Sequence, residues 1–130
     1  MTFVTVDSCR AQLERLTQLL VSSFPGSTIY QHTDLARVPH DVSCHRVDAV
    51  FLEATSGKLD LLQHLRRQTP TLPVFILSNT DQLQQEAVNA GADGYFVLPD
   101  GEQQLLDAIR LATNRSDQRA TELQPKRSIL

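Results

Sequence analysis

The sequence predicts an α/β fold in which one parallel β-sheet lies between layers of helices. Short apolar runs alternate along the chain with stretches of helical periodicity. Two of these runs, residues 47–52 and 74–77, are apolar at nearly every position, which indicates strands buried on both faces. Helices that connect parallel strands form right-handed crossovers, and this favours a doubly wound arrangement of five strands.

The N-terminal half alternates two expected strands with two expected helices. Residues 3–6 and 27–31 are the strands. Between them, apolar residues recur at three- and four-residue spacing on one helical face: Leu13, Leu16, Leu20 and Phe24. The second helix falls within residues 34–44, and Pro39 limits it to a turn or two.

The C-terminal half contains three further expected strands, over residues 47–52, 74–77 and 95–98. A helix follows each strand, and the three helices are marked by Leu59, Leu62 and Leu65, by residues 81–90, and by Leu105, Ala108, Ile109 and Ala112. Pro70 and Gly91 end the first two of these helices.

Length and composition favour one ordinary domain. The 130 residues are 41% hydrophobic and 21% charged, so we expect a domain over residues 1–115 and a polar tail or linker over residues 116–130. A net charge of −3 gives no general attraction to nucleic acid or to anionic membranes. The N-terminus lacks the pattern of a signal peptide, and the two cysteines, Cys9 and Cys44, fit a reduced cytoplasmic protein.

The carboxyl ends of the strands should hold any functional site, because the working crevice of a doubly wound fold lies there. The residues expected at these ends include Asp7, Ser8, Glu53, Ser78 and Leu98. They contain no nucleophile–base pair and no glycine-rich phosphate loop, which argues against an enzyme. Asp7 or Ser8 has a second interpretation as the cap of the first helix.

Three motifs give the chain a family resemblance. Gly91-Ala92-Asp93 opens the stretch GADGYFVLP, in which a short strand ends at a proline turn, and the flanking segments are helical. Together with LPVFILSN and VDAVFLE, the longer stretch AVNAGADGYFVLPDGEQQLLDAI resembles the fifth, fourth and third strands of a response-regulator receiver domain. The resemblance covers roughly residues 1–112. It implies a flavodoxin-like sheet of strand order 2-1-3-4-5 and a role in two-component signalling.

An active receiver transfers a phosphoryl group from a histidine kinase to its own aspartate. It uses an acidic pair and the acceptor aspartate to hold Mg²⁺, and a hydroxyl and a lysine to bind the new phosphate, because phosphoryl transfer depends on positioning and charge neutralisation. In this sequence Asp7 is retained, but Ser8 replaces the second acid, Glu53 replaces the acceptor and Leu98 replaces the lysine. Ser78 and Tyr95 match the hydroxyl and the switch aromatic.

These departures predict a degenerate receiver that works without phosphorylation. Ser8 removes a charge that would offset Mg²⁺, the extra methylene of Glu53 crowds the metal position, and Leu98 cannot pair with phosphate. The segment ATSGK after Glu53 is also shorter than the usual turn. We therefore expect no cofactor, with Mg²⁺ bound weakly if at all.

Several side chains have two interpretations. Glu53 either mimics the phosphorylated state or is a solvated acid, and the absence of a lysine at Leu98 favours the second. Ser78 is expected to bond nearby backbone. Tyr95 is either a rotamer switch or a half-buried strand aromatic. A zinc site is disfavoured, because the spacing of its candidate ligands matches no known finger: His32, His40, Asp41, Cys44 and His45.

The resemblance implies a signalling and protein-interaction module. Its expected contact surface is the fourth helix, fifth strand and fifth helix, about residues 81–112 around Tyr95, for a second copy or an output domain. No contact with membrane or nucleic acid is expected from this domain. The alternative is a receiver that still accepts phosphate, either in a phosphorelay or as the regulatory half of a DNA-binding transcriptional regulator.

Overall fold

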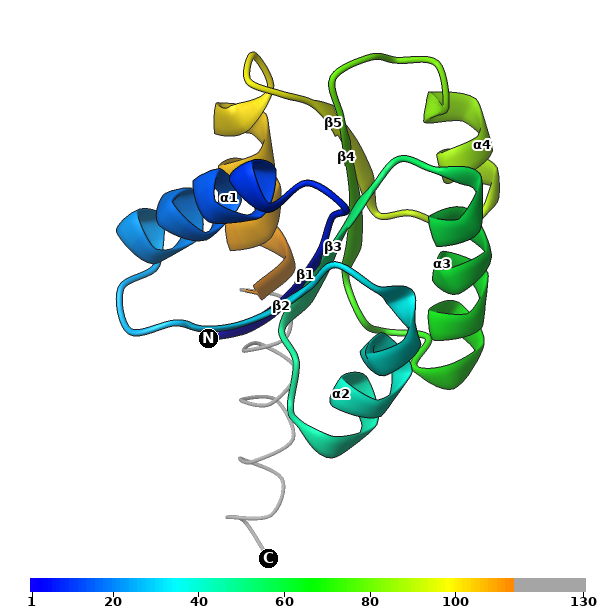
Figure 1. Ribbon diagram of the computed structural model, residues 1–130, viewed down its shortest axis with the longest axis horizontal. Coiled ribbons are helices and arrows are strands. Elements are labelled where there is room, and N and C mark those ends of the chain that lie inside the picture. The colour runs from blue at the N-terminus through cyan, green and yellow to red at the C-terminus, as the bar shows by residue number, and fades with distance from the viewer. Residues whose placement is uncertain (114–130) are drawn as a thin grey trace, which may run out of the picture.

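The computed structural model describes residues 1–113, apart from the side chains of Leu35 and Ser56, and they form a five-stranded sheet covered by helices (Figure 1). The strands are β1 (Thr2–Val6), β2 (Thr28–His32), β3 (Ala49–Glu53), β4 (Val74–Ser78) and β5 (Gly94–Val97). Every neighbouring pair is parallel, and the order is β2-β1-β3-β4-β5. The predicted fold class and strand order are confirmed. The expected tail, residues 116–130, lies outside the described residues.

Helices cover both faces of the sheet. They are α1 (Arg10–Ser23), the 3₁₀ turn η1 (Leu35–Arg37), α2 (Val38–Cys44), α3 (Ser56–Gln68), α4 (Gln84–Asn89) and a last helix over residues 102–113. α1 and the last helix lie on one face, and α2, α3 and α4 lie on the other (Figure 1). No helix within residues 1–113 has the length and apolar character needed to cross a bilayer.

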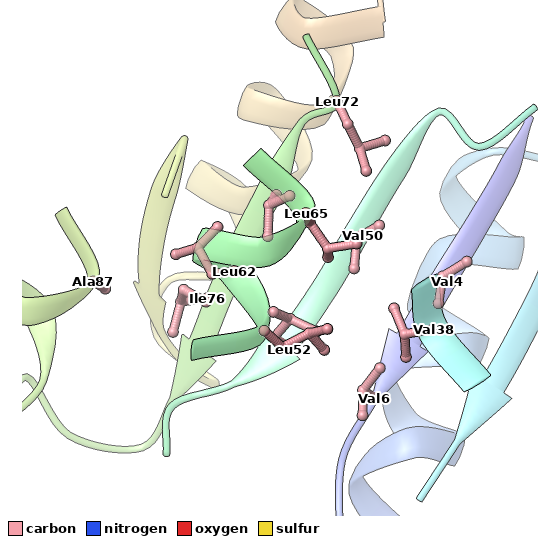
Figure 2. Packing of buried hydrophobic residues seen from close by; sticks show 12 residues of the cluster. Val4, Val6, Val38, Val50, Leu52, Leu62, Leu65, Leu72, Ile76 and Ala87 are labelled. Atoms are coloured by element: carbon pink, nitrogen blue, oxygen red, sulfur yellow. The ribbon is translucent and has the colours of Figure 1, made fainter. Parts of the chain in front are cut away.

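The sheet separates two apolar cores because its strand residues point alternately to either face. On the α2–α3–α4 side the core is aliphatic, and Figure 2 shows its strand members packed against the helices: Val4, Val6, Val50, Leu52 and Ile76 with Val38, Leu62, Leu65 and Ala87. On the other side three stacked or edge-packed rings, Phe3, Phe51 and Phe75, lie under α1 and the last helix. The strands are apolar on both faces because each face of the sheet packs against one of these cores.

The Gly-Ala-Asp motif ties the start of β4 to the start of β5. Asp93 accepts a hydrogen bond from the Val74 backbone N–H at 2.7 Å and forms an ion pair with Arg66. Arg66 also donates to the Gly91 carbonyl at 2.7 Å. Gly91 follows the end of α4 with φ +99°, a left-handed conformation that favours glycine, so its predicted role as a helix stop is confirmed.

Two helix starts differ from the prediction. α1 is capped by Cys9, in extended conformation and without a side-chain bond, instead of by Asp7 or Ser8. Asp7 Oδ1 accepts the Cys9 N–H at 2.8 Å, which turns the chain one residue before the helix begins. α4 begins at Gln84 and not at residue 81, because residues 81–84 form a turn. In this turn the Asp81 carbonyl accepts the Gln84 N–H at 3.2 Å.

Candidate functional site

The sequence-predicted residues converge at the carboxyl edge of the sheet. Asp7 follows β1, Glu53 ends β3, Ser78 ends β4 and Leu98 follows β5. All four line one cavity of about 390 Å³, which α1 closes from one side. Ser8 does not line the cavity, but its backbone N–H donates to Glu53 Oε1 at 2.9 Å. The structure therefore brings the predicted set together.

Glu53 is ion-paired, and its partner is a lysine that the sequence reasoning missed. The ammonium of Lys58 donates to the same Oε1 atom that accepts the Ser8 N–H. Lys58 lies in the first turn of α3, where Thr55 caps the helix and accepts the Lys58 N–H. Its side chain is buried, with the whole residue 7% exposed. Interpreting Glu53 as a solvated acid without a cation was wrong.

A weak signal for this contact was present in the sequence. Lys58 follows Glu53 by five residues, within the segment ATSGK, where Thr55 is a good N-cap residue. A cap at Thr55 starts the helix at once and places Lys58 over the end of β3. The family resemblance places a cation only at the position of Leu98, so it does not predict this contact.

The two carboxyls of the crevice have opposite pKa shifts. Burial raises the pKa of Asp7 to about 6, and the adjacent Glu53 carboxylate reinforces the rise. Burial also acts to raise the pKa of Glu53, but the hydrogen bonds from Lys58 and from the Ser8 N–H outweigh it and lower that pKa to about 2. Glu53 therefore holds the negative charge, and Asp7 retains its proton into the mildly acidic range.

The donor set does not fit Mg²⁺. This ion prefers an octahedral shell of oxygen ligands, several of them charged. Here the Lys58 ammonium lies on the Glu53 carboxylate, and a serine stands beside Asp7 where a second acid would be needed. Within residues 1–113 no cluster of three or more His, Cys, Asp or Glu side chains is arranged to hold a metal.

Thr80 connects the hydroxyl position to the aromatic position. Ser78 Oγ accepts the Thr80 N–H at 3.1 Å, so the expected bond to nearby backbone is confirmed. The Tyr95 hydroxyl donates to the Thr80 carbonyl at 2.7 Å, and its half-buried ring packs on the aliphatic core. Leu98 packs instead with the aromatic core, and the Leu98–Pro99 peptide bond is cis.

The histidines around α2 divide into separate contacts. His32 pairs with Asp41. His45 stacks on Tyr30 with ring centroids 4.6 Å apart. Cys44 lies 3.5 Å from the ring of His40, its neighbour one helical turn away. These contacts are pairs and do not converge on one point.

Comparison with solved structures decides which fold this is. The signal receiver domain of an HD domain-containing protein from Pseudomonas fluorescens Pf-5 is 27% identical to this chain and superposes with a TM-score of 0.78. The match covers 92% of this chain and 91% of that one. The fold is that of a response-regulator receiver domain.

Two further solved structures have the same fold at lower identity. The receiver domain protein from Clostridium thermocellum is 24% identical, with a TM-score of 0.76 over 89% of this chain and 96% of that one. A LuxR family DNA-binding response regulator from Silicibacter pomeroyi is 23% identical, with a TM-score of 0.74 over 88% of this chain and 92% of that one. No family model and no curated protein matches the sequence. The receiver resemblance is thus confirmed for the fold, and the degenerate variant stays a prediction.

Proposed function

We propose that this chain is a receiver domain that acts without phosphorylation, as a signalling and protein-interaction module and not as an enzyme. The observation that carries the proposal is the ion pair between Glu53 and Lys58 at the carboxyl end of β3. In an active receiver the acceptor carboxylate at this place must be free to attack phosphorus. Here one oxygen of the Glu53 carboxylate, Oε1, already accepts from an ammonium and a backbone N–H.

The surroundings of Glu53 also disfavour phosphoryl transfer. The reaction needs cations to neutralise the transferred group, and within residues 1–113 no cluster of three or more His, Cys, Asp or Glu side chains could hold Mg²⁺. Lys58 is already neutralised by Glu53, and Leu98 presents an apolar side chain to the cavity. A phosphoryl group would therefore enter a crevice in which Lys58 is paired with Glu53 and the Asp7 carboxyl already accepts the Cys9 N–H. We infer that the Glu53–Lys58 pair keeps the carboxyl edge of the sheet in the unphosphorylated state.

The proposed contact surface is formed by α4, β5 and the last helix, about residues 81–112 around Tyr95. β5 is an edge strand of the sheet. Two large apolar side chains are exposed on the flanking helices, Val88 at 56% and Leu111 at 55%. An output domain or a second copy of the chain is the proposed partner, with no direct contact to nucleic acid or membrane. A cytoplasmic location belongs to this proposal, and the two free cysteines support it.

Phosphorylation by a small phosphodonor tests the proposal. The full chain is incubated with acetyl phosphate and Mg²⁺, and its intact mass is measured. We expect no gain of a phosphoryl group by the native chain or by the Glu53→Asp variant. The triple variant Ser8→Asp, Glu53→Asp and Leu98→Lys is the comparison most favourable to modification. A phosphoryl group on the native chain would overturn the proposal.

The second candidate is a receiver that still accepts phosphate. The retention of Asp7, Ser78 and Tyr95 at their family positions favours it. One similar structure belongs to a LuxR family DNA-binding response regulator, so the regulatory half of a transcriptional regulator is the corresponding role. The same mass measurement separates the two candidates, because only this one predicts modification of the native chain.

A further inference from the structure

The cavity at the carboxyl edge extends beyond the family's phosphorylation residues. Its outer wall is one face of α1, where Gln12, Arg15, Leu16 and Leu19 recur at helical spacing. The opposite wall is formed by Leu98, Pro99 and Glu102 at the start of the last helix. Phe51 and Leu77, from the aromatic core, form the floor. In Figure 1, α1 and the last helix lie together on this face of the sheet.

The size and lining of this cavity suit a small molecule. Its volume of about 390 Å³ falls in the range of ligand pockets, which is roughly 300–1,000 Å³. Such pockets combine a mostly apolar lining with a few polar groups that converge on the ligand. Here Leu16, Leu19 and Leu98 provide an apolar surface between two walls that each carry one charged side chain.

Arg15 and Glu102 carry charges of opposite sign on facing walls of the cavity, and the acids Asp7 and Glu53 lie at its closed end. Arg15 on α1 and Glu102 on the opposite wall have no hydrogen-bond or ion-pair partner for their side chains within residues 1–113. At the closed end, Glu53 is neutralised by Lys58. A ligand that carries both a carboxylate and an ammonium group could pair with Arg15 and Glu102 at once, while an apolar body covers the leucines.

One buried polar group points to the same face of the sheet. The Thr5 hydroxyl is fully buried and has no hydrogen-bond partner within the described part of the chain. Thr5 is in register with Phe51, whose ring lines the floor of the cavity. The sheet face beneath the cavity is therefore not wholly apolar.

We propose that this cavity binds a free apolar α-amino acid, with its carboxylate on Arg15, its ammonium group on Glu102 and its side chain on Leu16, Leu19 and Leu98. The binding does not depend on whether Glu53 accepts phosphate, so failure of either proposal leaves the other standing. It gives the domain a small-molecule input at the edge where an active receiver is phosphorylated.

Titration of the full chain with L-leucine, followed by backbone amide NMR shifts, tests this proposal. We expect saturable shifts around residues 15 and 98–102, with a dissociation constant in or below the millimolar range. Three comparison ligands each lack one feature: 4-methylpentanoate has no ammonium group, 3-methylbutylamine has no carboxylate, and glycine has no apolar body. Each should bind about tenfold more weakly than leucine, the loss expected for one missing charge-assisted or apolar contact.

Matched variants distinguish the cavity from the general surface. Arg15→Gln and Glu102→Gln should each weaken leucine binding about tenfold, because each removes one charged partner. Arg10→Gln and Glu14→Gln change the same residue types on the exposed surface of α1, outside the cavity, and should leave binding unchanged. All four replace polar side chains outside the core, so the fold is retained. The proposal is overturned by the absence of saturable shifts up to about 10 mM, by equal binding of the comparison ligands, or by equal losses in the control variants.

Discussion

Three titratable side chains, Asp7, Glu53 and Lys58, meet at the carboxyl end of β3. Glu53 accepts from the Lys58 ammonium and from the Ser8 N–H, and its pKa is lowered to about 2. Burial raises the pKa of Asp7 to about 6, and the neighbouring ionised Glu53 adds to this rise. The two acids therefore differ in charge at mildly acidic pH, because only Glu53 stays ionised when the pH falls below 6.

The raised pKa of Asp7, about 6, makes folding stability depend on pH. The folded state binds this proton more tightly than the unfolded chain, so the favourable contribution is complete below the ordinary pKa of 3.8 and is lost as pH rises through 6. Asp7→Asn removes the titration. We expect the variant to gain on the order of 1 kcal/mol relative to the native chain between pH 4 and pH 7.5.

Urea denaturation at both pH values measures this gain. Asp60→Asn is the matched control, because Asp60 is an exposed acid on α3. A difference between Asp7→Asn and the native chain that stays the same at pH 4 and pH 7.5 would contradict the assignment of the pH dependence to Asp7.

The strands were the best predicted elements, and the reason is burial. Residues 74–77 and 47–52 are apolar on both faces because each face of the sheet packs against a core. A continuous apolar run therefore identified these strands without an alternating polar pattern. The start of α4 was less predictable. Asp81 is a typical cap residue, but contacts through Thr80 to Ser78 and Tyr95 hold the chain in a turn, and a contact from a distant strand is invisible to local patterns.

The sequence predicted which residues lie at the site but not which of their side chains pair with each other. Asp7, Ser78 and Leu98 could be placed because each directly follows or ends a strand. The Glu53–Lys58 pair could not, because it depends on where α3 begins and on the Lys58 side chain contacting the last residue of β3. A two-residue difference in that start would place Lys58 on another side of the helix.

At the scale of elements, Asp93 joins the starts of β4 and β5 and is expected to matter for stability. Asp93→Ala would leave the Val74 N–H, which belongs to a fully buried residue, without its acceptor, and would remove the ion-pair partner of Arg66. An unsatisfied buried donor costs about 1–3 kcal/mol, so we expect a loss of that order in the free energy of unfolding. Asp100→Ala, an exposed acid in the β5 turn, is the control for urea denaturation, and equal losses in both variants would contradict this role.

At the scale of the whole molecule, the surface of α4, β5 and the last helix is expected to mediate association. Light scattering after size exclusion should find a dimer, or a pull-down should recover a partner. Val88→Glu with Leu111→Glu should abolish either interaction, because charges replace exposed apolar contacts. Val21→Glu is the matched control, since Val21 is 45% exposed on α1 and outside this surface. A strict monomer that recovers no partner would contradict this expectation.

The chain has the fold of a receiver domain, and at the acceptor position Glu53 is paired with Lys58. The same edge then offers a cavity whose walls carry Arg15 and Glu102. Regulation by a bound molecule or by a protein partner would replace regulation by phosphate. The proposed loss of phosphoryl transfer depends on Glu53 and Lys58 remaining paired.

NMR titration of the Glu53 side-chain carboxyl tests this pairing most directly. In the native chain the pKa of Glu53 should be about 2, well below its ordinary value of 4.5, because Lys58 and the Ser8 N–H stabilise the carboxylate. In the Lys58→Met variant the pKa should rise, because burial then acts without the ammonium. A pKa of Glu53 near 4.5 in the native chain, unchanged by Lys58→Met, would contradict the ion pair and with it the proposed loss of phosphoryl transfer.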